Sequence, residues 1–172
     1  MLLGLALLYI GAVLIINGLW ILGYVGDREI TFINLFTGFV TLCVALYSAF
    51  GPGADAASIK GGALSMLFSA TYLWVAFNRI VGADGRGLGW FCLFVTITAI
   101  PVAIQTLSGV HNISMTWLGI DWCLWALLWF AFYLLLGLQL KIGRPTAYLC
   151  IAVGIVTAWV PGFLMINGLL SA

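Results

Sequence analysis

The sequence predicts an all-α integral membrane protein built as a six-helix bundle, and three observations lead to this fold class. First, 65% of the 172 residues are hydrophobic and only 6% are charged, whereas a soluble domain needs charge to solvate its surface. Second, the charged residues gather in a few short segments. Third, the stretches between these segments hold about 20 mostly apolar residues each, the length of a helix that crosses a bilayer.

Six predicted spans follow one another along the chain. They cover residues 2–24, 30–50, 61–80, 88–107, 118–137 and 146–169. The connectors are rich in glycine or charge, as in "YVGDRE" and "FGPGADAASIK". We expect residues 1–172 to form a single transmembrane domain, without room for a nucleotide-driven pump or a large extramembrane enzyme. The first span lacks a basic leading segment and is too long for a signal peptide, so we expect it to be retained.

Basic residues predict how the bundle is oriented. Lysine and arginine lie mostly in the connectors after spans one, three and five: Arg28, Arg79, Arg86, Lys141 and Arg144. The opposite side holds only Lys60. Because basic connectors stay in the cytoplasm, we expect both chain ends outside it. The formal net charge is +1 and no basic tract occurs, which argues against nucleic acid as a partner.

The interiors of the predicted spans hold polar residues that are neutral. Every charged residue is expected at or beyond a span end, with Arg79 and Asp121 closest to entering. Ion-coupled carriers keep an ionisable group near the midplane, so these interiors suit a small uncharged solute that forms hydrogen bonds. Alternatively, the polar groups only join helices. Paired carboxylates, metal-ligand clusters and activated nucleophiles are missing from the spans, so we expect no enzyme, metal or cofactor.

Span one carries two stripes. Branched aliphatic residues and an amide recur at spacings of four and three, which places on one helix face Leu3, Leu7, Ile10, Leu14 and Asn17. Beside them run Gly4, Gly11 and Gly18, a repeat that permits close helix packing. An asparagine amide inside a membrane needs partners or a wet pathway. The first stripe therefore fits a solute pathway, although a core or lipid-facing stripe has the same spacing.

Aromatic residues form a second pattern at mid-depth. Span five contains Trp122, Trp125 and Trp129 at spacings of three and four, and span three contains Phe68 and Tyr72 one turn apart. Interfacial tryptophans lie near span ends, and Trp125 and Trp129 are too deep for that role. Such rings either pack a core or narrow a slot to the thickness of a flat molecule.

Spans four and six share an interruption. "VTITAIP" ends at Pro101 and "IVTAWVPG" contains Pro161, each proline following a Thr-Ala pair. Proline frees a backbone carbonyl about one turn upstream. Interrupted helices in transporters point towards the substrate path, so we expect the carbonyls freed by these prolines to bond the solute, unless both sites are simple kinks.

Several segments, taken together, resemble one family of membrane proteins. These are "GLALLYIGAVLIING", "FINLFTG", "SMLFSATYLWVAFN", "DWCLWALLW" and "TAWVPG", in that order over essentially the whole chain. They resemble the AmiS/UreI family of bacterial inner-membrane channels for urea and short-chain amides. The resemblance implies a twisted bundle of three two-helix hairpins, six spans with both ends outside, and a hexameric ring whose protomers each carry a cofactor-free pore.

The resemblance also implies a set of pore residues. Leu3, Leu7, Ile10, Leu14 and Asn17 match the pore positions of span one, and Phe68 and Tyr72 match the pore aromatics of span three. From spans five and six we add Trp122, Trp125, Trp129 and Trp159. The tryptophan spacing in span five differs from the family pattern, so these tryptophans are the less direct assignments.

Two departures separate this chain from the acid-gated members of the family. Those members carry long outer loops rich in histidine, and a glutamate in span six where this chain has Val153; here His111 is the single histidine. The sequence thus predicts a passive facilitator of urea, acetamide or formamide without acid gating, and the resemblance implies that it works beside a cytoplasmic amidase or urease. Two alternatives stay open: a proton-coupled amide transporter that uses Asp121, and a non-transporting membrane subunit.

Overall fold

The computed structural model describes residues 1–109 and 112–170, and these residues form helices joined by short connectors. Five long helices come first: α1 Leu2–Ile21, α2 Ile30–Phe50, α3 Ala56–Val81, α4 Arg86–Leu107 and α5 Ile113–Phe132. The π-helical turn η1, Tyr133–Gly137, extends α5. The last span consists of α6 Gly143–Val153, the π-helical turn η2 Gly154–Trp159 and α7 Val160–Ile166. Together these elements form six spans, each long and apolar enough to cross a membrane, as the sequence predicts.

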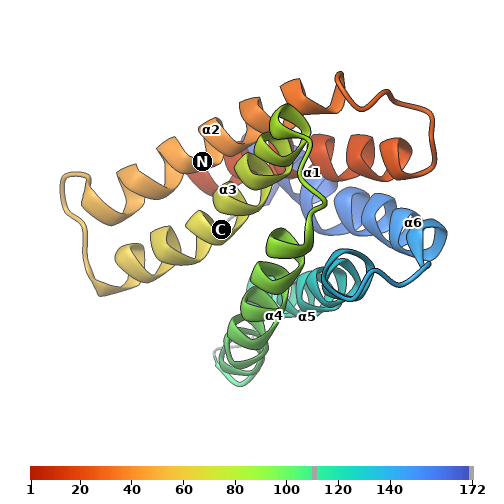
Figure 1. Cartoon of the computed structure of the whole chain (residues 1–172). Helices are drawn as coiled ribbons and strands as arrows, with labels where there is room; N and C mark the ends of the chain where they lie inside the picture. Colours follow the sequence, from red (N-terminus) through yellow and green to blue (C-terminus); the bar gives the residue numbers. More distant parts are fainter. Residues whose placement is uncertain (110–111, 171–172) are drawn as a thin grey trace.

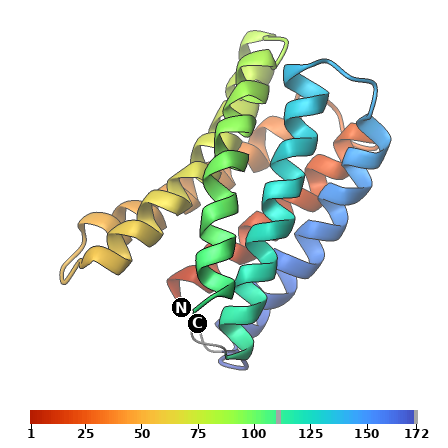
Figure 2. The same ribbon diagram turned by 90° about the horizontal axis from the view of Figure 1, so that it is seen from below.

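The six spans pack as three close antiparallel pairs. α2 packs against α3 and α4 against α5, and these pairs are hairpins closed by a connector. The third pair is α1 with the last span (Figure 1), and it brings the start of α1 and the end of α7 together at one end of the bundle (Figure 2). The connector end of the α2–α3 hairpin projects away from the other helices (Figure 2). Three helix pairs are the arrangement that the resemblance implied, with α1 and the last span pairing without a connector.

The glycine stripe of α1 faces the last span. A methyl group built on Gly11 would lie 2.5 Å from the backbone nitrogen of Trp159, and one on Gly18 would lie 2.8 Å from the carbonyl oxygen of Ala147. From the other side, a methyl group on Gly162 would lie 2.6 Å from the backbone nitrogen of Leu8. Only glycine permits such backbone approach. The prediction that this stripe mediates close helix packing is confirmed.

Two helices begin five residues earlier than the sequence suggested. α3 starts after Asp55, whose carboxylate accepts a hydrogen bond from the Ser58 backbone at 2.8 Å, while the Asp55 backbone donates to the Ser58 hydroxyl at 2.8 Å. α5 starts after Asn112, whose side chain accepts from the Met115 backbone at 2.7 Å. These caps satisfy the free N–H groups of the first turn and extend each helix into its connector.

The early start of α5 corrects an expectation about charge. Asp121 lies two turns inside α5 and its residue is only 2% exposed, not at the end of a span. Its Oδ1 atom is buried without a hydrogen-bond partner among the described residues. A membrane-spanning helix therefore contains the Asp121 carboxyl group, which the predicted boundaries placed at the edge of the span.

The two prolines act differently from the expectation. α4 continues through Pro101, which is exposed on the outside of the bundle. The last span changes to a π-helical turn over Gly154–Trp159, directly before the buried Pro161. A π-helical turn widens the helix locally and is a recognised way to accommodate strain. The two prolines follow similar motifs in the sequence, but their structural surroundings differ.

Candidate functional site

Two cavities lie end to end inside the bundle and contain almost all the predicted site residues. The larger, here called the Asn17 cavity, has a volume of about 460 Å³, and among its lining residues are Leu14, Asn17, Phe68, Tyr72, Trp125 and Trp129. The smaller, the Leu3 cavity, has a volume of about 290 Å³, and its lining includes Leu3, Leu7, Ile10, Phe68, Trp122 and Trp125. Phe68 and Trp125 line both cavities and separate them.

The aromatic side chains at this junction pack around Phe68. The Phe68 ring centroid lies 4.6 Å from the Trp129 ring centroid. It lies 4.9 Å from the Trp125 ring centroid, and the planes of the Phe68 and Trp125 rings meet at 84°. Trp122 stands 5.1 Å from Trp125 at 80°. Tilted and edge-to-face contacts of this kind are favourable because the ring edge is positive and the ring face negative. The junction is therefore a packed group of flat, rigid rings between the two cavities.

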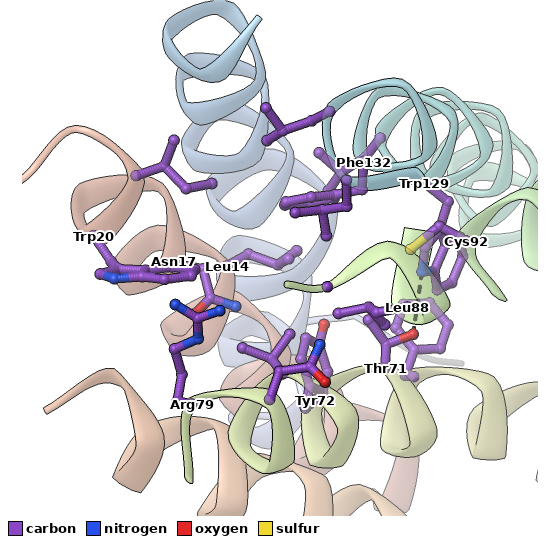
Figure 3. A pocket seen from close by; sticks show the side chains of 18 of the residues that line it. Leu14, Asn17, Trp20, Thr71, Tyr72, Arg79, Leu88, Cys92, Trp129 and Phe132 are labelled. Atoms are coloured by element: carbon purple, nitrogen blue, oxygen red, sulfur yellow. Dashed lines mark hydrogen bonds between the residues drawn. The ribbon is translucent and has the colours of Figure 1, made fainter. Parts of the chain in front are cut away.

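Two threonines hold the tryptophan rings in place. The Trp125 indole N–H donates to the Thr157 hydroxyl at 2.8 Å. The Trp129 indole N–H donates to the Thr71 hydroxyl at 3.3 Å (Figure 3). Each hydroxyl in turn donates to the carbonyl one turn back in its own helix, at 2.7 and 2.8 Å. The indole N–H groups are thus satisfied by the protein, and the ring faces remain to contact a solute.

Asn17 has a partner that the sequence did not identify. Its side-chain N–H donates to the side-chain oxygen of Asn34 at 3.2 Å, and its side-chain oxygen accepts from the side-chain N–H of Asn34 at 2.7 Å. These two bonds join α1 to α2. Figure 3 shows Asn17 beside Leu14 and Trp20 on one side of the cavity, with Trp129 and Cys92 opposite. Asn17 therefore has both a protein partner and a place in the cavity wall, the two explanations for a buried amide.

The Asn17 cavity reaches polar groups at the bundle end formed by the α1–α2, α3–α4 and α5–α6 connectors. Arg79 lies 3.7 Å from the Asp27 carboxylate and its guanidinium stands 5.2 Å from the Trp20 ring. Trp20 donates to the same Asp27 oxygen at 2.6 Å. Asp84 also lines this end, and hydrogen bonds from the Arg86 backbone and guanidinium lower the pKa of its carboxyl group. This opening is charged, whereas the interior beyond it is neutral.

The remaining predicted positions lie away from the two cavities. Trp159 is 48% exposed on the outside of the last span and lines neither cavity, and the same holds for Pro101. Pro161 lines a third cavity of about 100 Å³ together with Asp121, Leu3 and Leu7. The carbonyls that these prolines free belong to Ile97 and Thr157, one turn upstream, and neither residue lines the two cavities that we assign to the pathway. His111 lies outside the described residues.

Several cavity residues were not among the predicted set. They include Thr71, Asn78, Arg79, Leu88, Cys92, Leu128 and Phe132 in the Asn17 cavity, and Thr41, Val44, Ser48 and Ser65 in the Leu3 cavity. One indication was present in the sequence: a tryptophan at mid-depth needs an acceptor, and threonine was available on neighbouring spans. Which threonine faces which tryptophan depends on how the helices are rotated, which spacing within one helix does not give.

Six spanning helices that enclose two adjoining cavities define a membrane protein of the channel and transporter class. The model of the AmiS/UreI family transporter matches residues 2–169. A protein of Mycolicibacterium smegmatis named as an amidate substrates transporter is 40% identical over 166 residues, which covers 96% of this chain and 76% of that protein. The chain therefore belongs to the AmiS/UreI family.

Relatives from Helicobacter pylori agree in sequence and in structure. An acid-activated urea channel of this organism is 35% identical over 188 aligned residues, covering 95% of this chain and 96% of that protein. The cryo-electron microscopy structure of its urea channel in a closed state superposes with a TM-score of 0.86 at 33% identity, covering 98% of this chain and all of that one. The crystal structure of the H. pylori urea channel superposes with a TM-score of 0.83 at 36% identity, with 98% of each chain covered. The relatives are channels and transporters, not enzymes.

Proposed function

We propose that this protein is a passive channel for small neutral amides, such as urea, acetamide and formamide, in a bacterial inner membrane. The observation that carries the proposal is the meeting of the Asn17 and Leu3 cavities at Phe68 and Trp125. Their walls begin near the chain ends, at Leu3, and end near the opposite connectors, at Asp84. Together the two cavities follow the depth of the bundle.

The walls suit a flat, uncharged solute. The rings of Phe68, Trp125 and Trp129 offer apolar faces, while Thr71 and Asn17 offer neutral hydrogen-bonding groups. An ion entering between such walls would lose its hydration without compensation. A planar amide buries its faces against aromatic rings and keeps its polar edge for a few hydrogen bonds. Urea and acetamide have this shape and charge, and the relatives are named for amidate substrates and for urea.

We further propose that acid does not activate this channel, unlike its relatives from H. pylori that are named acid-activated. The support is the single histidine in the chain and the short segments that join the helices at the end where the termini lie, such as residues 51–55. The family resemblance supports a homo-hexamer with one pathway in each protomer, termini outside the cytoplasm, and a cytoplasmic amidase or urease that consumes the solute.

Substitution of the junction phenylalanine tests the proposal. Phe68→Ala removes the ring around which the junction tryptophans pack, so propionamide permeability in proteoliposomes should rise several-fold relative to that of urea. Phe94→Ala is the matched control, because Phe94 is 58% exposed on the outside of α4. An unchanged propionamide-to-urea ratio in a folded Phe68→Ala protein would remove the junction from the pathway.

A proton-coupled amide transporter is the second candidate, because Asp121 places a carboxyl group inside α5 next to Leu3 and Leu7 of the pathway. The two mechanisms differ in one measurement. A channel equilibrates labelled acetamide across proteoliposomes even with a pH gradient, and Asp121→Asn leaves this flux intact. Accumulation above the outside concentration, lost in Asp121→Asn, would establish the coupled transporter instead.

A further inference from the structure

The side chains of Asn17 and Asn34 form a closed ring of two hydrogen bonds between α1 and α2. Asn17 donates to Asn34 at 3.2 Å, and Asn34 donates to Asn17 at 2.7 Å. The Asn34 amide nitrogen also donates to the Ile30 carbonyl oxygen one turn back, at 2.9 Å. Asn34 is completely buried and Asn17 is 5% exposed. Asn34 is therefore shielded from water, whereas Asn17 borders the cavity.

The Ile30 carbonyl determines which way both amides point. A carbonyl oxygen accepts hydrogen bonds and cannot donate, so the Asn34 atom facing it must be the amide nitrogen. This orientation directs the Asn34 oxygen and one N–H towards Asn17, which must present an N–H and an oxygen in return. Flipping either amide would bring like groups together in a buried site, which costs the hydrogen bonds and adds repulsion.

A donor inventory shows what remains for a solute. An asparagine amide has two N–H donors. Asn34 uses both, one on Asn17 and one on Ile30. Asn17 uses one on Asn34, and no second acceptor for it occurs among the described residues. Of the two amides, only Asn17 lines the Asn17 cavity. The cavity wall thus carries one N–H donor whose orientation is set through Asn34 from the backbone of α2.

We propose that Asn34 is a positioning residue that holds Asn17 so that its remaining N–H binds the carbonyl oxygen of the passing solute. This inference rests on the proposed function and refines it, because it assigns selectivity to the solute's carbonyl group rather than to its NH₂ groups. Without Asn34, the Asn17 amide rotates to a carbonyl of its own helix, and the donor leaves the cavity wall. Urea and thiourea distinguish this role, because sulfur accepts hydrogen bonds more weakly than oxygen.

The experiment compares urea and thiourea permeability in proteoliposomes for the wild type, Asn34→Leu, Asn17→Leu and the double variant. We expect urea flux in both single variants to fall by a factor of about three to ten, which corresponds to the loss of one hydrogen bond. Thiourea flux should fall much less. The double variant should lose no more than Asn17→Leu, since Asn34 acts through Asn17. Thr37→Val is the matched control, because Thr37 is equally buried on α2, bonds only a backbone carbonyl and lines neither cavity.

A role confined to joining α1 and α2 gives different results. In that case Asn34→Leu and Thr37→Val lower stability alike, and urea and thiourea permeability fall together or not at all, which overturns the inference. Asn34→Ser replaces Asn34→Leu if the latter does not assemble, since a serine hydroxyl bonds its own helix backbone as Thr41 does. Absence of urea flux in the wild type would overturn the proposed function itself, whereas wild-type flux with an unaltered urea-to-thiourea ratio in the Asn34 variants overturns only this inference.

Discussion

Individual residues in the pathway depend on partners in other spans. The indole N–H groups of Trp125 and Trp129 are satisfied because Thr157 and Thr71 accept them. Threonine suits this task, since its hydroxyl donates to its own helix and still accepts a further hydrogen bond. Polar residues inside the spans therefore both join helices and shape the pathway. The two explanations considered from the sequence are compatible.

Removal of one hydroxyl tests this arrangement. Thr157→Val leaves the buried Trp125 indole N–H without an acceptor, which should destabilise the protein by about 1–3 kcal/mol and reduce urea flux as the ring changes orientation. Thr98→Val is the control, because the exposed Thr98 hydroxyl bonds only the Phe94 carbonyl. Thermal unfolding in detergent and liposome flux measure the two effects. Equal stability of the two variants would show that the indole N–H does not need Thr157.

For individual residues, the sequence predicted one of the two partners in each contact but not the other. The spacing of Leu3, Leu7, Ile10, Leu14 and Asn17 placed them on one face, and the structure lines the two cavities with them in that order. The spacing did not identify Asn34 as the partner of Asn17, because that pairing depends on the register between α1 and α2. Trp159 was assigned to the pathway from its motif, yet the π-helical turn that ends at this residue leaves it on the outside.

Whole elements are positioned by glycine. The backbones of α1 and the last span approach closely at Gly4, Gly11 and Gly18, and this contact fixes the stripe of α1 that faces the cavities. The close approach also turns the other face of α1, with Asn17, towards α2 and α3. Packing of these glycines against the last span thus determines which face α1 presents to the cavities.

Gly11→Leu should disrupt this packing. Its first side-chain carbon would lie 2.5 Å from the Trp159 backbone nitrogen, so α1 must move away, at a cost of about 1–3 kcal/mol or more. We expect a lower Tm and loss of urea flux. Gly143→Ala serves as the control, because a methyl group there meets only Ile21 at an ordinary distance of 3.6 Å. A Gly11→Leu protein with wild-type Tm and flux would contradict the close contact.

The α3 cap gives a pH-dependent prediction. Hydrogen bonds from the Ser58 backbone and hydroxyl lower the pKa of Asp55 in the folded protein below its ordinary value of 3.8. A lowered pKa means that this carboxylate stabilises the fold above its unfolded pKa, and that the contribution is lost as pH falls through the folded pKa. Asp55→Ala should therefore lower Tm at pH 7, with a smaller difference from wild type near pH 3. A difference of the same size at both pH values would exclude the cap as its cause.

The two caps also show why span boundaries were harder to predict than spans. Hydropathy identified all six helices, because a bilayer requires long apolar segments. It started the third and fifth too late, since the first turns of α3 and α5 are polar and are stabilised by Asp55 and Asn112 rather than by burial. The error at α5 had a functional consequence, because it moved Asp121 from the membrane to its edge.

The whole molecule combines an apolar exterior with an interior whose buried polar side chains are amides and hydroxyls, apart from the carboxyl group of Asp121. Aromatic and aliphatic side chains cover the outside of the helices, among them Phe39, Phe94 and Ile97, each more than half exposed, as a lipid-facing surface requires. The interior holds two cavities with the aromatic junction between them. The fold follows from hydropathy and glycine spacing, whereas the path through it follows from how the spans are rotated.

We propose that this interior conducts small amides passively and without acid activation. Stopped-flow permeability of proteoliposomes to urea and acetamide, at pH 7.5 and at pH 5, tests it most directly. We predict fast flux that does not saturate and that is similar at both pH values. Flux that appears only at pH 5 would contradict the absence of acid gating, and permeability no greater than that of empty liposomes at either pH would contradict the channel itself and leave a non-transporting membrane subunit.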